Sequence, residues 1–511
     1  MQNKRWLVWI TLAGLAVRIG AWFYFRAHTL GLVTDRLTDD ALYYFTIAHN
    51  LAHGDGISFD TIHPTNGMHP LWLFLITPVF AMSLTKWGFI HAVFLFQSVL
   101  DAALIWLIGS TIYDLLPNAS DSNRKTAAAS AAVIYALSFI VIVRSINGLE
   151  TTLTALLFVL WFRVYLQVKS GQLGHWIILG IVTGFLLLAR TDSFLVLLPL
   201  ALYTLVTRGK MEWKWMLLAL VLACVVIAPW LIWNLANFGS IVQSSAEAVP
   251  MLAMRKYQVL YGSWKYWHFA LEGARNALKL FWYAAFGLPL LTIGYAIIAR
   301  RKRLSPAERA IYLLVVGNVL LLLVHSVLRG FIRDWYIVEL LPLVLIGFGI
   351  SIGANAGADE RSSTEARASG RFTLAALVIF FQVILYRQPP YVSQATILEA
   401  GLPAIEKLTT QYKVASFNSG YYGYFASRPG SVVNIDGVVN SDALRALKAG
   451  RIGDYLAHDS VSYILDFEGD FGGYINLFDP HLLDGFGFVP DSMLGCPDSK
   501  DSLYLYRRRT N

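Results

Sequence analysis

The sequence predicts a polytopic α-helical membrane protein that ends in a smaller α/β domain. Of its 511 residues, 56% are hydrophobic and only 14% are charged, whereas soluble domains carry roughly 25% charged residues. Many of the apolar residues form runs of the length that crosses a bilayer, which is about 20 residues for a helix. The C-terminal part is instead rich in Gly, Asp and Tyr, which indicates a region outside the membrane.

Charge and cysteine content narrow the class further. The formal net charge is +8, and the basic residues gather in short loops, as the positive-inside rule expects of a membrane protein. No nucleic-acid partner is therefore expected. Cys224 lies in an apolar segment and Cys496 in the polar tail, so neither a disulfide framework nor a zinc site is predicted. Residues 6–25 lack a small-residue cleavage site, and we expect an uncleaved first span with a cytoplasmic N-terminus.

Twelve apolar segments are candidates for membrane helices, and about eleven are expected to cross. Residues 70–84 form the exception, because this segment is short and contains Pro70 and Pro78; a juxtamembrane or re-entrant helix on the outer face is expected. If this segment does not cross, the orientation counted forwards from the basic N-terminus agrees with the one counted backwards from the other basic loops. Both place the polar C-terminal tail outside. The twelve segments are 6–25, 70–84, 89–113, 126–143, 151–168, 176–188, 194–206, 215–235, 277–298, 310–328, 335–353 and 372–386.

Two domains follow from this pattern. Residues 1–386 are expected to form the membrane domain, with residues 26–69 as its first outer loop, and residues 387–511 the outer α/β domain. Strand-like runs in the tail alternate with helix-like runs, which is typical of an α/β arrangement. The strand-like runs are 413–417, 431–435 and 462–465, and the helix-like runs are 441–449 and 452–456.

An acidic pair, Asp39 and Asp40, follows the first apolar segment in the stretch TDDALYYFTIAHNLAH. Ionisable groups at a membrane are costly and by default mark a function. A carboxylate there can take the proton of a bound alcohol, or can hold a divalent metal that does so. The structural alternative is a helix start, since Thr38 and acidic residues favour one. Both can hold at once, and which aspartate acts as the base is left open.

Other polar residues of the outer loops are candidates for the same site. Glu150 is expected to return to the face of the acidic pair as a second acid or a metal ligand, or simply as a first-turn helix residue. Arginine binds phosphate through its bidentate fork, although headgroup snorkelling is the alternative for each cation. The candidate phosphate-binding residues are Arg144, Arg190, Arg255, Lys256, Arg329 and Arg333. The candidate substrate contacts are His63, Asn66, His69 and Tyr257.

Several stretches resemble the GT-C superfamily of membrane glycosyltransferases that use polyprenyl-phosphate-linked sugars. DDALYYFTIAHNLAHGDGISF with HPTNGMHPLW is similar to the first outer loop of that superfamily, RSINGLETTLTALLF to its second outer loop, and RTDSFLVLLPL to a later helix pair. The tail stretch GYYGYFASRPGSVVNIDGVVNSDAL and the stretch NFGSIVQSSAEAV are most similar to the bacterial branch that contains the mycobacterial arabinofuranosyltransferases. In layout, the resemblance covers the whole chain.

The resemblance implies an inverting glycosyltransferase that moves a sugar, arabinofuranose in that branch, from a polyprenyl-phosphate donor to a glycan, lipid or protein acceptor. Asp39 or Asp40 would be the base, and boundary arginines would stabilise the departing phosphate. The second loop reads NGLE where a DxE pair would bind metal, so dependence on a divalent metal is left open. The implied location is the bacterial cytoplasmic membrane, with the site facing the periplasm. The alternative function is a flippase for lipid-linked sugars, although the internal repeats typical of transporters are not evident.

Overall fold

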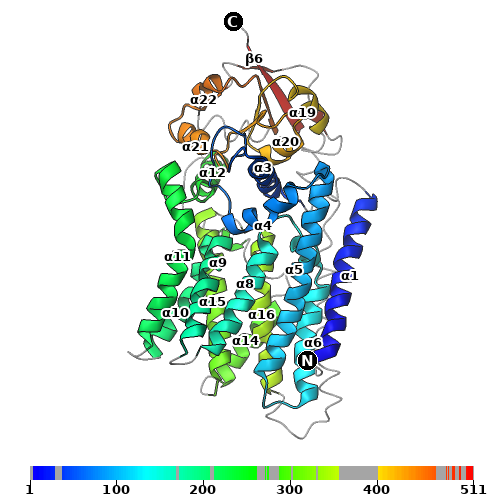
Figure 1. Cartoon of the computed structure of the whole chain (residues 1–511), viewed down its shortest axis with the longest axis vertical. Coiled ribbons are helices and arrows are strands. Elements are labelled where there is room, and N and C mark those ends of the chain that lie inside the picture. Colours follow the sequence, from blue (N-terminus) through cyan, green and yellow to red (C-terminus); the bar gives the residue numbers. More distant parts are fainter. Residues whose placement is uncertain are drawn as a thin grey trace.

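The computed structural model describes residues 4–28, 37–168, 172–207, 212–261, 271, 273–275, 287–300, 303–329, 332–355 and 401–467, and short pieces between 479 and 509. A bundle of long helices forms one layer, and a small sheet with its own helices covers one end of it (Figure 1). The N-terminal end of α1 lies at the far end of the bundle from the sheet. The expected segment 372–386 and the boundary at 386/387 lie outside the described residues.

The bundle is built from apolar helices. Within the described residues, five helices are long and apolar enough to cross a membrane, and shorter apolar helices pack among them. The bundle helices are α1 (Arg5–His28), α5 (Lys86–Leu115), α6 (Asp121–Leu137), α7 (Phe139–Arg144), α8 (Thr151–Gln167), α9 (Leu173–Ala189), α10 (Phe194–Thr207), α11 (Trp213–Phe238), α14 (Gly287–Arg300), α15 (Pro306–Arg329) and α16 (Asp334–Asn355). The 3₁₀ turn η2 (Thr191–Ser193) joins α9 to α10.

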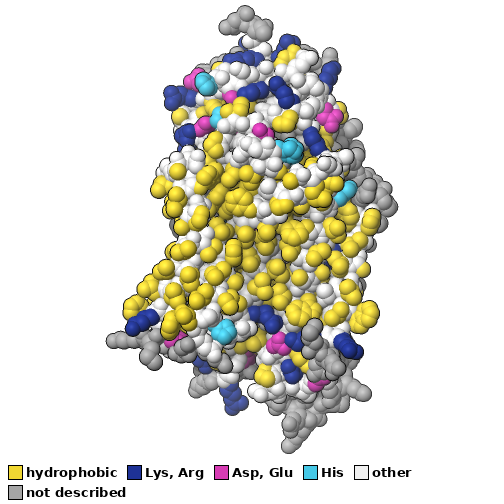
Figure 2. Space-filling model, in the orientation of Figure 1, with side chains coloured by type: hydrophobic (Ala, Val, Ile, Leu, Met, Phe, Trp, Pro, Cys, Tyr) yellow, Lys and Arg dark blue, Asp and Glu magenta, His cyan; other side chains and the backbone are white. Residues whose placement is uncertain are grey.

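The surface of the bundle is divided as a membrane requires. Figure 2 shows a broad band of hydrophobic side chains around the middle of the visible face, with charged side chains gathered at the two ends. An exposed apolar band of this kind is typical of a surface that contacts lipid. The prediction of a polytopic membrane protein is confirmed.

Three helices lie between the bundle and the sheet, namely α3 (Asp39–His53), α4 (Pro70–Phe80) and α12 (Ser244–Tyr261) (Figure 1). At about 1.5 Å per residue, the 11 residues of α4 are too short to cross a bilayer. This helix packs against α3, α5 and α9. The expectation that the segment beginning at Pro70 does not cross is therefore confirmed.

The predicted span 126–143 is wrong in one respect, because two helices occupy it. Helix α6 ends at Leu137, and α7 starts at Phe139. Ser138 between them has φ −64° and ψ 119°, an extended conformation that breaks the helix. The break ends α6 and begins the short helix α7, which contacts α16, α6 and α1; periodicity alone does not reveal it.

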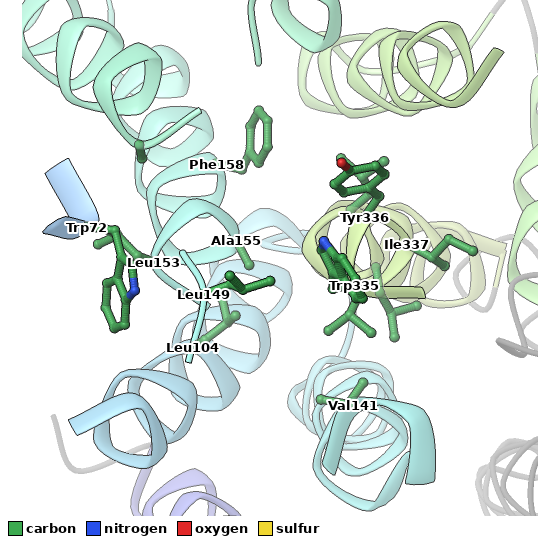
Figure 3. Packing of buried hydrophobic residues seen from close by; sticks show 14 of the residues in the cluster. Trp72, Leu104, Val141, Leu149, Leu153, Ala155, Phe158, Trp335, Tyr336 and Ile337 are labelled. Atoms are coloured by element: carbon green, nitrogen blue, oxygen red, sulfur yellow. The ribbon is translucent and has the colours of Figure 1, made fainter. Parts of the chain in front are cut away.

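Helix α16 lies at the centre of the packing and contacts α5, α6, α8, α14 and α15. Figure 3 shows Trp335 and Tyr336 of this helix close to Leu149, Ala155 and Phe158 of the second loop and α8. Gly349 and Gly353 of this helix allow neighbouring residues to approach closely. A Cβ at Gly349 would lie 2.6 Å from a methyl carbon of Ile112.

A buried ion pair holds the first helix to the bundle. The Nε atom of Arg18 donates to Oδ2 of Asp101 at 2.6 Å, and the hydroxyl of Tyr135 donates to Oδ1 at 2.7 Å. Neither charged side chain has any exposed surface. Helices α1, α5 and α6 are thereby joined inside the bundle.

The described part of the C-terminal region forms a six-stranded sheet with short helices. The strand order is β2-β1-β3-β6-β4, and β5 also pairs with β6. Strands β2, β1 and β3 are parallel, whereas β6 runs antiparallel to β3, β4 and β5. The elements are α19 (Leu402–Leu408), β1 (Val414–Ser416), α20 (Ser419–Phe425), β2 (Val432–Asn434), α21 (Ser441–Lys448), α22 (Ile452–His458), β3 (Tyr463–Phe467), β4 (Phe486–Phe488), β5 (Leu494–Gly495) and β6 (Ser502–Arg508).

The predicted alternation of strands and helices in the tail is confirmed at all five predicted runs. Alternate residues of a strand point to opposite faces, and the two faces of this sheet have different partners. Ala415, Val433 and Ile464 belong to a separate small core with α21 and α22. Val414 and Val432 instead belong to the same hydrophobic cluster as α20, α3 and the bundle. The sheet is therefore docked on the bundle through α20.

We expect Asp101→Asn to lower the free energy of unfolding by about 3–5 kcal/mol, because it leaves the buried Arg18 guanidinium without a counter-charge. Asp114→Asn is the matched control, since Asp114 is partly exposed in its ion pair with Lys4 and its loss costs about 0–1 kcal/mol. Unfolding by sodium dodecyl sulfate in micelles, followed by tryptophan fluorescence, measures both. Equal losses in the two variants would contradict this role of the buried pair.

Candidate active site

The acidic pair lies where the sheet meets the bundle. Thr38 caps α3 by accepting a hydrogen bond from the amide of Ala41, so the predicted helix start is confirmed. The carboxylate of Asp39 accepts hydrogen bonds from the backbone amides of Gly420 at 3.2 Å and Tyr421 at 2.8 Å. One member of the pair thus binds the first turn of α20, far away in the sequence.

A second buried carboxylate binds the residues just before those two amides. Asp466 of β3 accepts hydrogen bonds from the amide of Phe417 at 2.5 Å and the hydroxyl of Ser416 at 3.0 Å. Its other oxygen accepts one from the side chain of Asn418 at 2.9 Å. The turn between β1 and α20 is therefore fixed before it reaches α3.

Close approach at this junction requires glycine. A Cβ at Gly420 would lie 2.2 Å from the backbone oxygen of Asp39. A Cβ at Gly423 would lie 2.3 Å from the ring of Phe59 in the first loop. The hydroxyl of Tyr421 also donates to the carbonyl of Leu37 at 2.8 Å. Helix α20 is therefore seated directly on α3 and the first loop.

The two aspartates differ in environment. Burial raises the pKa of Asp39 to about 7; the amide of Tyr421 opposes this shift, and the charge of Asp40 adds to it. Asp40 is exposed. At neutral pH, Asp39 is thus a partly protonated group engaged with α20, whereas Asp40 faces solvent.

A third carboxyl group, from the sheet, is influenced by the charges of the pair. Asp436 lies in the loop after β2, and burial raises its pKa to about 8, with Asp39 and Asp40 both adding to the shift. Sequence analysis did not select Asp436. It follows a strand in a Gly-containing turn, and this pattern carries no signal of an interaction with the acidic pair.

Glu150 contacts α3, the helix of the acidic pair, from the bundle side. The hydroxyl of Tyr44 donates to Oε2 of Glu150 at 2.9 Å and accepts from the amide of His69 at 2.9 Å. The Nε2 atom of His69 lies 3.7 Å from Oε1 of Glu150. Tyr44 is one helical turn from Asp40, which places the two on neighbouring positions of one face of α3. Glu150 therefore lies against the helix that carries the acidic pair, and its part as a second acid stays a prediction.

A buried charge cluster lies beneath Glu150. Arg190 is within 2.7 Å of carboxylate oxygens of Asp192 and Glu339 and 3.6 Å from Oε1 of Glu150. His325 contacts the other side of the cluster at 2.7 Å from Asp192. Three carboxylates thus surround one guanidinium. Glu339 had a usable sequence signal, because it is an acidic residue inside an apolar segment.

The other predicted cations lie at the rim or outside the described side chains. Arg144 forms an ion pair with Asp334 at 3.3 Å. The guanidinium of Arg333 lies 5.5 Å from the ring centre of Trp335. Arg255 is exposed on α12 and bonded to Gln258. The side chains of Lys256, Tyr257 and Arg329 lie outside the described part of the structure.

Two residues of the first loop that are predicted substrate contacts also join parts of the chain. Asn66 is buried, donates to the carbonyl of Val242 and accepts from the amide of Ser244. The Nδ1 atom of His63 lies 2.7 Å from Asp60, and its Nε2 atom lies 3.6 Å from Asp442 of α21. These contacts hold the first loop against α12 and the sheet.

Among the described residues, no group of three or more His, Cys, Asp or Glu side chains is placed to hold a metal ion. We therefore derive no step through a metal.

Comparison with known proteins identifies the fold. A profile of the dolichyl-phosphate-mannose-protein mannosyltransferase family matches residues 68–233. No curated protein matches the chain. The match therefore falls on the helices that follow the first loop.

Solved structures match over nearly the whole chain. The Archaeoglobus fulgidus oligosaccharyltransferase tethered with an acceptor peptide has a TM-score of 0.58 at 12% identity, over 98% of this chain and 74% of that one. The same enzyme with an inhibitory peptide and a dolichol-phosphate has a TM-score of 0.55 at 12% identity, over 97% and 74%. ArnT from Cupriavidus metallidurans bound to undecaprenyl phosphate has a TM-score of 0.56 at 11% identity, over 98% of both chains. The chain therefore has the predicted GT-C fold of polytopic membrane proteins.

We expect Gly420→Ala to weaken docking of the sheet by about 1–3 kcal/mol, because the added Cβ overlaps the Asp39 backbone. Protease sensitivity of the region 401–467 in micelles measures docking, and about a tenfold faster cleavage is expected. Gly174→Ala is the control, since a Cβ there meets nothing within 4 Å. Unchanged cleavage of Gly420→Ala would show that α20 does not rest on α3.

Proposed function

We propose that the protein is a glycosyltransferase that moves a sugar from a polyprenyl-phosphate donor to a hydroxyl group of an acceptor. The observation that carries the proposal is an exposed carboxylate, Asp40, at the end of a GT-C bundle, beneath a docked α/β domain. Structural relatives with bound dolichol-phosphate or undecaprenyl phosphate support a lipid-phosphate donor. The family match to dolichyl-phosphate-mannose-protein mannosyltransferases supports the reaction type.

Asp40 is the general base in this proposal. Asp39 already accepts two backbone amides and holds α20 in place, so its main part is positional. Asp40 is exposed one residue further along the same helix. A carboxylate positioned beside an acceptor hydroxyl removes its proton as the oxygen attacks the sugar, and such a base contributes roughly 10²–10⁴-fold to the rate.

The donor phosphate is bound at the rim of the bundle. Arg144 is there in an ion pair with Asp334, the residue that follows Arg333 in the chain. Arginine side chains stabilise the negative charge that develops as the phosphate leaves. Arg190 is surrounded by carboxylates, and we assign it to holding Glu150 under α3 and not to the phosphate.

The finer features of the proposal come from the sequence resemblance. We propose arabinofuranose as the transferred sugar and the periplasmic face of the bacterial cytoplasmic membrane as the location. The region 387–511 acts there as an outer domain, and a glycan, lipid or protein carries the acceptor hydroxyl. Contact of the first loop with residues 401–467 supports placing both on one side of the membrane.

We expect Asp40→Asn to lower kcat by about 10²–10⁴-fold with donor binding retained, because it removes the base and keeps the shape. Purified protein in micelles would receive radiolabelled decaprenyl-phosphoryl arabinose or its mannosyl counterpart, with cell-envelope acceptors. Asp55→Asn is the control, since Asp55 is an exposed aspartate of the same loop and should keep full activity.

Two results would contradict the proposal. Transfer that survives in Asp40→Asn would remove this residue from catalysis. Movement of the lipid-linked sugar between the leaflets of proteoliposomes, without transfer from any donor, would favour a flippase instead.

A further inference from the structure

The second loop lies directly against the helix of the acidic pair. Its Gly148 has φ +83°, a conformation that favours glycine. A Cβ at this position would lie 2.7 Å from the Cβ of Ala41 and 3.2 Å from a methyl carbon of Leu37. Ala41 is the residue that follows Asp40 in the first turn of α3. The backbone of the second loop is therefore part of the surface on which that turn rests.

Side chains bind the backbone of the loop at this point. The carbonyl of Gly148 accepts a hydrogen bond from Nε1 of Trp72 in α4 at 2.8 Å. One side chain, that of Gln97 in α5, binds both the amide of Gly148 and the carbonyl of Leu149. Asn147 of the loop itself accepts from the amide of Leu149 at 3.0 Å. Every backbone polar group of Gly148 and Leu149 thus has a side-chain partner.

Gln97 is the side chain that spans both residues. Its Oε1 atom accepts from the amide of Gly148 at 2.9 Å, and its Nε2 atom donates to the carbonyl of Leu149 at 2.7 Å. The residue has no exposed surface and lies about three turns into an apolar helix that is long enough to cross a membrane. Backbone outside a helix is tolerated at membrane depth only where it is buried in protein. The two hydrogen bonds therefore hold the loop at a defined place against α5.

The residue after Leu149 contacts the same helix of the acidic pair. Glu150 accepts a hydrogen bond from the hydroxyl of Tyr44 at 2.9 Å, and Tyr44 lies one helical turn from Asp40. Arg190 lies 3.6 Å from the other carboxylate oxygen of Glu150. The two residues that Gln97 binds are therefore part of a short segment that contacts α3 through both Gly148 and Glu150.

We propose that Gln97 is a positioning residue of the transferase site. It holds the second loop so that Gly148 supports the first turn of α3 and Glu150 accepts the hydrogen bond of Tyr44. These contacts set the place of the Asp40 carboxylate. The inference rests on the proposed function, in which Asp40 is the base. It gives a part in the reaction to a polar side chain inside the bundle that does not itself act on the substrates.

The effect on the reaction follows from geometry. A base must lie within hydrogen-bond reach of the proton that it removes, and a displacement of about 1 Å can cost about 10²-fold in rate. Without the Gln97 side chain, the loop keeps its contacts with Trp72 and Asn147 but loses the other two. Arg144 is held separately, by its ion pair with Asp334. Loss of the Gln97 side chain should therefore lower kcat and leave donor binding unchanged.

The test compares three variants of the full chain in micelles, with the donor and the cell-envelope acceptors of the assay above. Gln97→Leu removes both hydrogen bonds and keeps a side chain of similar size. Gln97→Glu keeps the size and an acceptor, and its carboxyl group supplies the donor only while it is protonated. Ser98→Ala is the matched control, because the buried hydroxyl of Ser98 donates to the carbonyl of Phe94 within α5.

We expect Gln97→Leu to lower kcat by about 10–100-fold with KM for the donor unchanged, and Ser98→Ala to keep full activity. Buried carboxyl groups keep their proton to a higher pH than exposed ones, so Gln97→Glu should recover most of the wild-type kcat at about pH 6. Its kcat relative to wild type should fall reversibly towards about pH 9, because the carboxyl group then loses the hydrogen that the Leu149 carbonyl accepts.

The ratio to wild type isolates the substituted side chain. The titratable and charged groups of the loop and its neighbours are present in both proteins, so their own titration cancels. They are Asp39, Asp40, Tyr44, His69, Glu150 and Arg190. A residue that only stabilised the fold would not give a folded variant whose kcat depends on pH in this way.

Hydrogen exchange of residues 37–50 reports on α3 without any substrate. Gln97→Leu should speed exchange in the first turn of α3, because Gly148 no longer supports it in one place, whereas Ser98→Ala should leave exchange as in wild type. If Gln97→Leu does not fold, the reversible pH dependence of Gln97→Glu decides the question.

Wild-type kcat in Gln97→Leu, or unchanged exchange of the first turn of α3, would overturn the assignment of Gln97. Equal loss of kcat in Gln97→Leu and Gln97→Glu at every pH would also overturn it, because the fit of the side chain and not its hydrogen bonds would then matter. The proposed function fails separately, through transfer that persists in Asp40→Asn.

Discussion

The Asp39 carboxylate accepts hydrogen bonds from two amides of α20, and the first of these lies 381 residues further along the chain. The bundle and the sheet are each held by their own cores, but their mutual position depends on this contact and on the packing of Gly420 against α3. A carboxylate in such a place is costly to bury unless its hydrogen bonds are satisfied. The sheet supplies those hydrogen bonds, and in return it is placed over the first loop.

The arrangement of the site follows from that contact. With Asp39 engaged, the neighbouring Asp40 is the carboxylate of the pair that is exposed. On the bundle side of α3, the hydroxyl of Tyr44 donates a hydrogen bond to Glu150. Glu150 in turn lies next to Arg190 of the buried charge cluster. Asp39 thus faces the sheet, whereas Tyr44 and the paired charges stabilise the bundle side of the helix.

Local features of this protein were predictable from its sequence, whereas contacts between residues far apart in the sequence were not. Hydropathy identified the membrane helices, the two prolines marked the non-crossing segment at Pro70, and alternation identified the first three strands. Charge parity placed Glu150 on the face of the acidic pair. The break at Ser138 and the influence of the pair on Asp436 depend on tertiary contacts, to which a period of 2 or 3.6 residues is blind. Glu339 was detectable as an intramembrane acid, but its pairing with Arg190 was not.

The most direct measurement of this account is hydrogen exchange of the amides of Gly420 and Tyr421 in the full-length protein in micelles. Wild type should protect both amides, Asp39→Ala should expose them, and Asp40→Ala should leave them protected. That pattern would establish that Asp39 holds the sheet and that Asp40 does not. Equal exchange in wild type and Asp39→Ala would contradict the account, because docking would then not depend on Asp39.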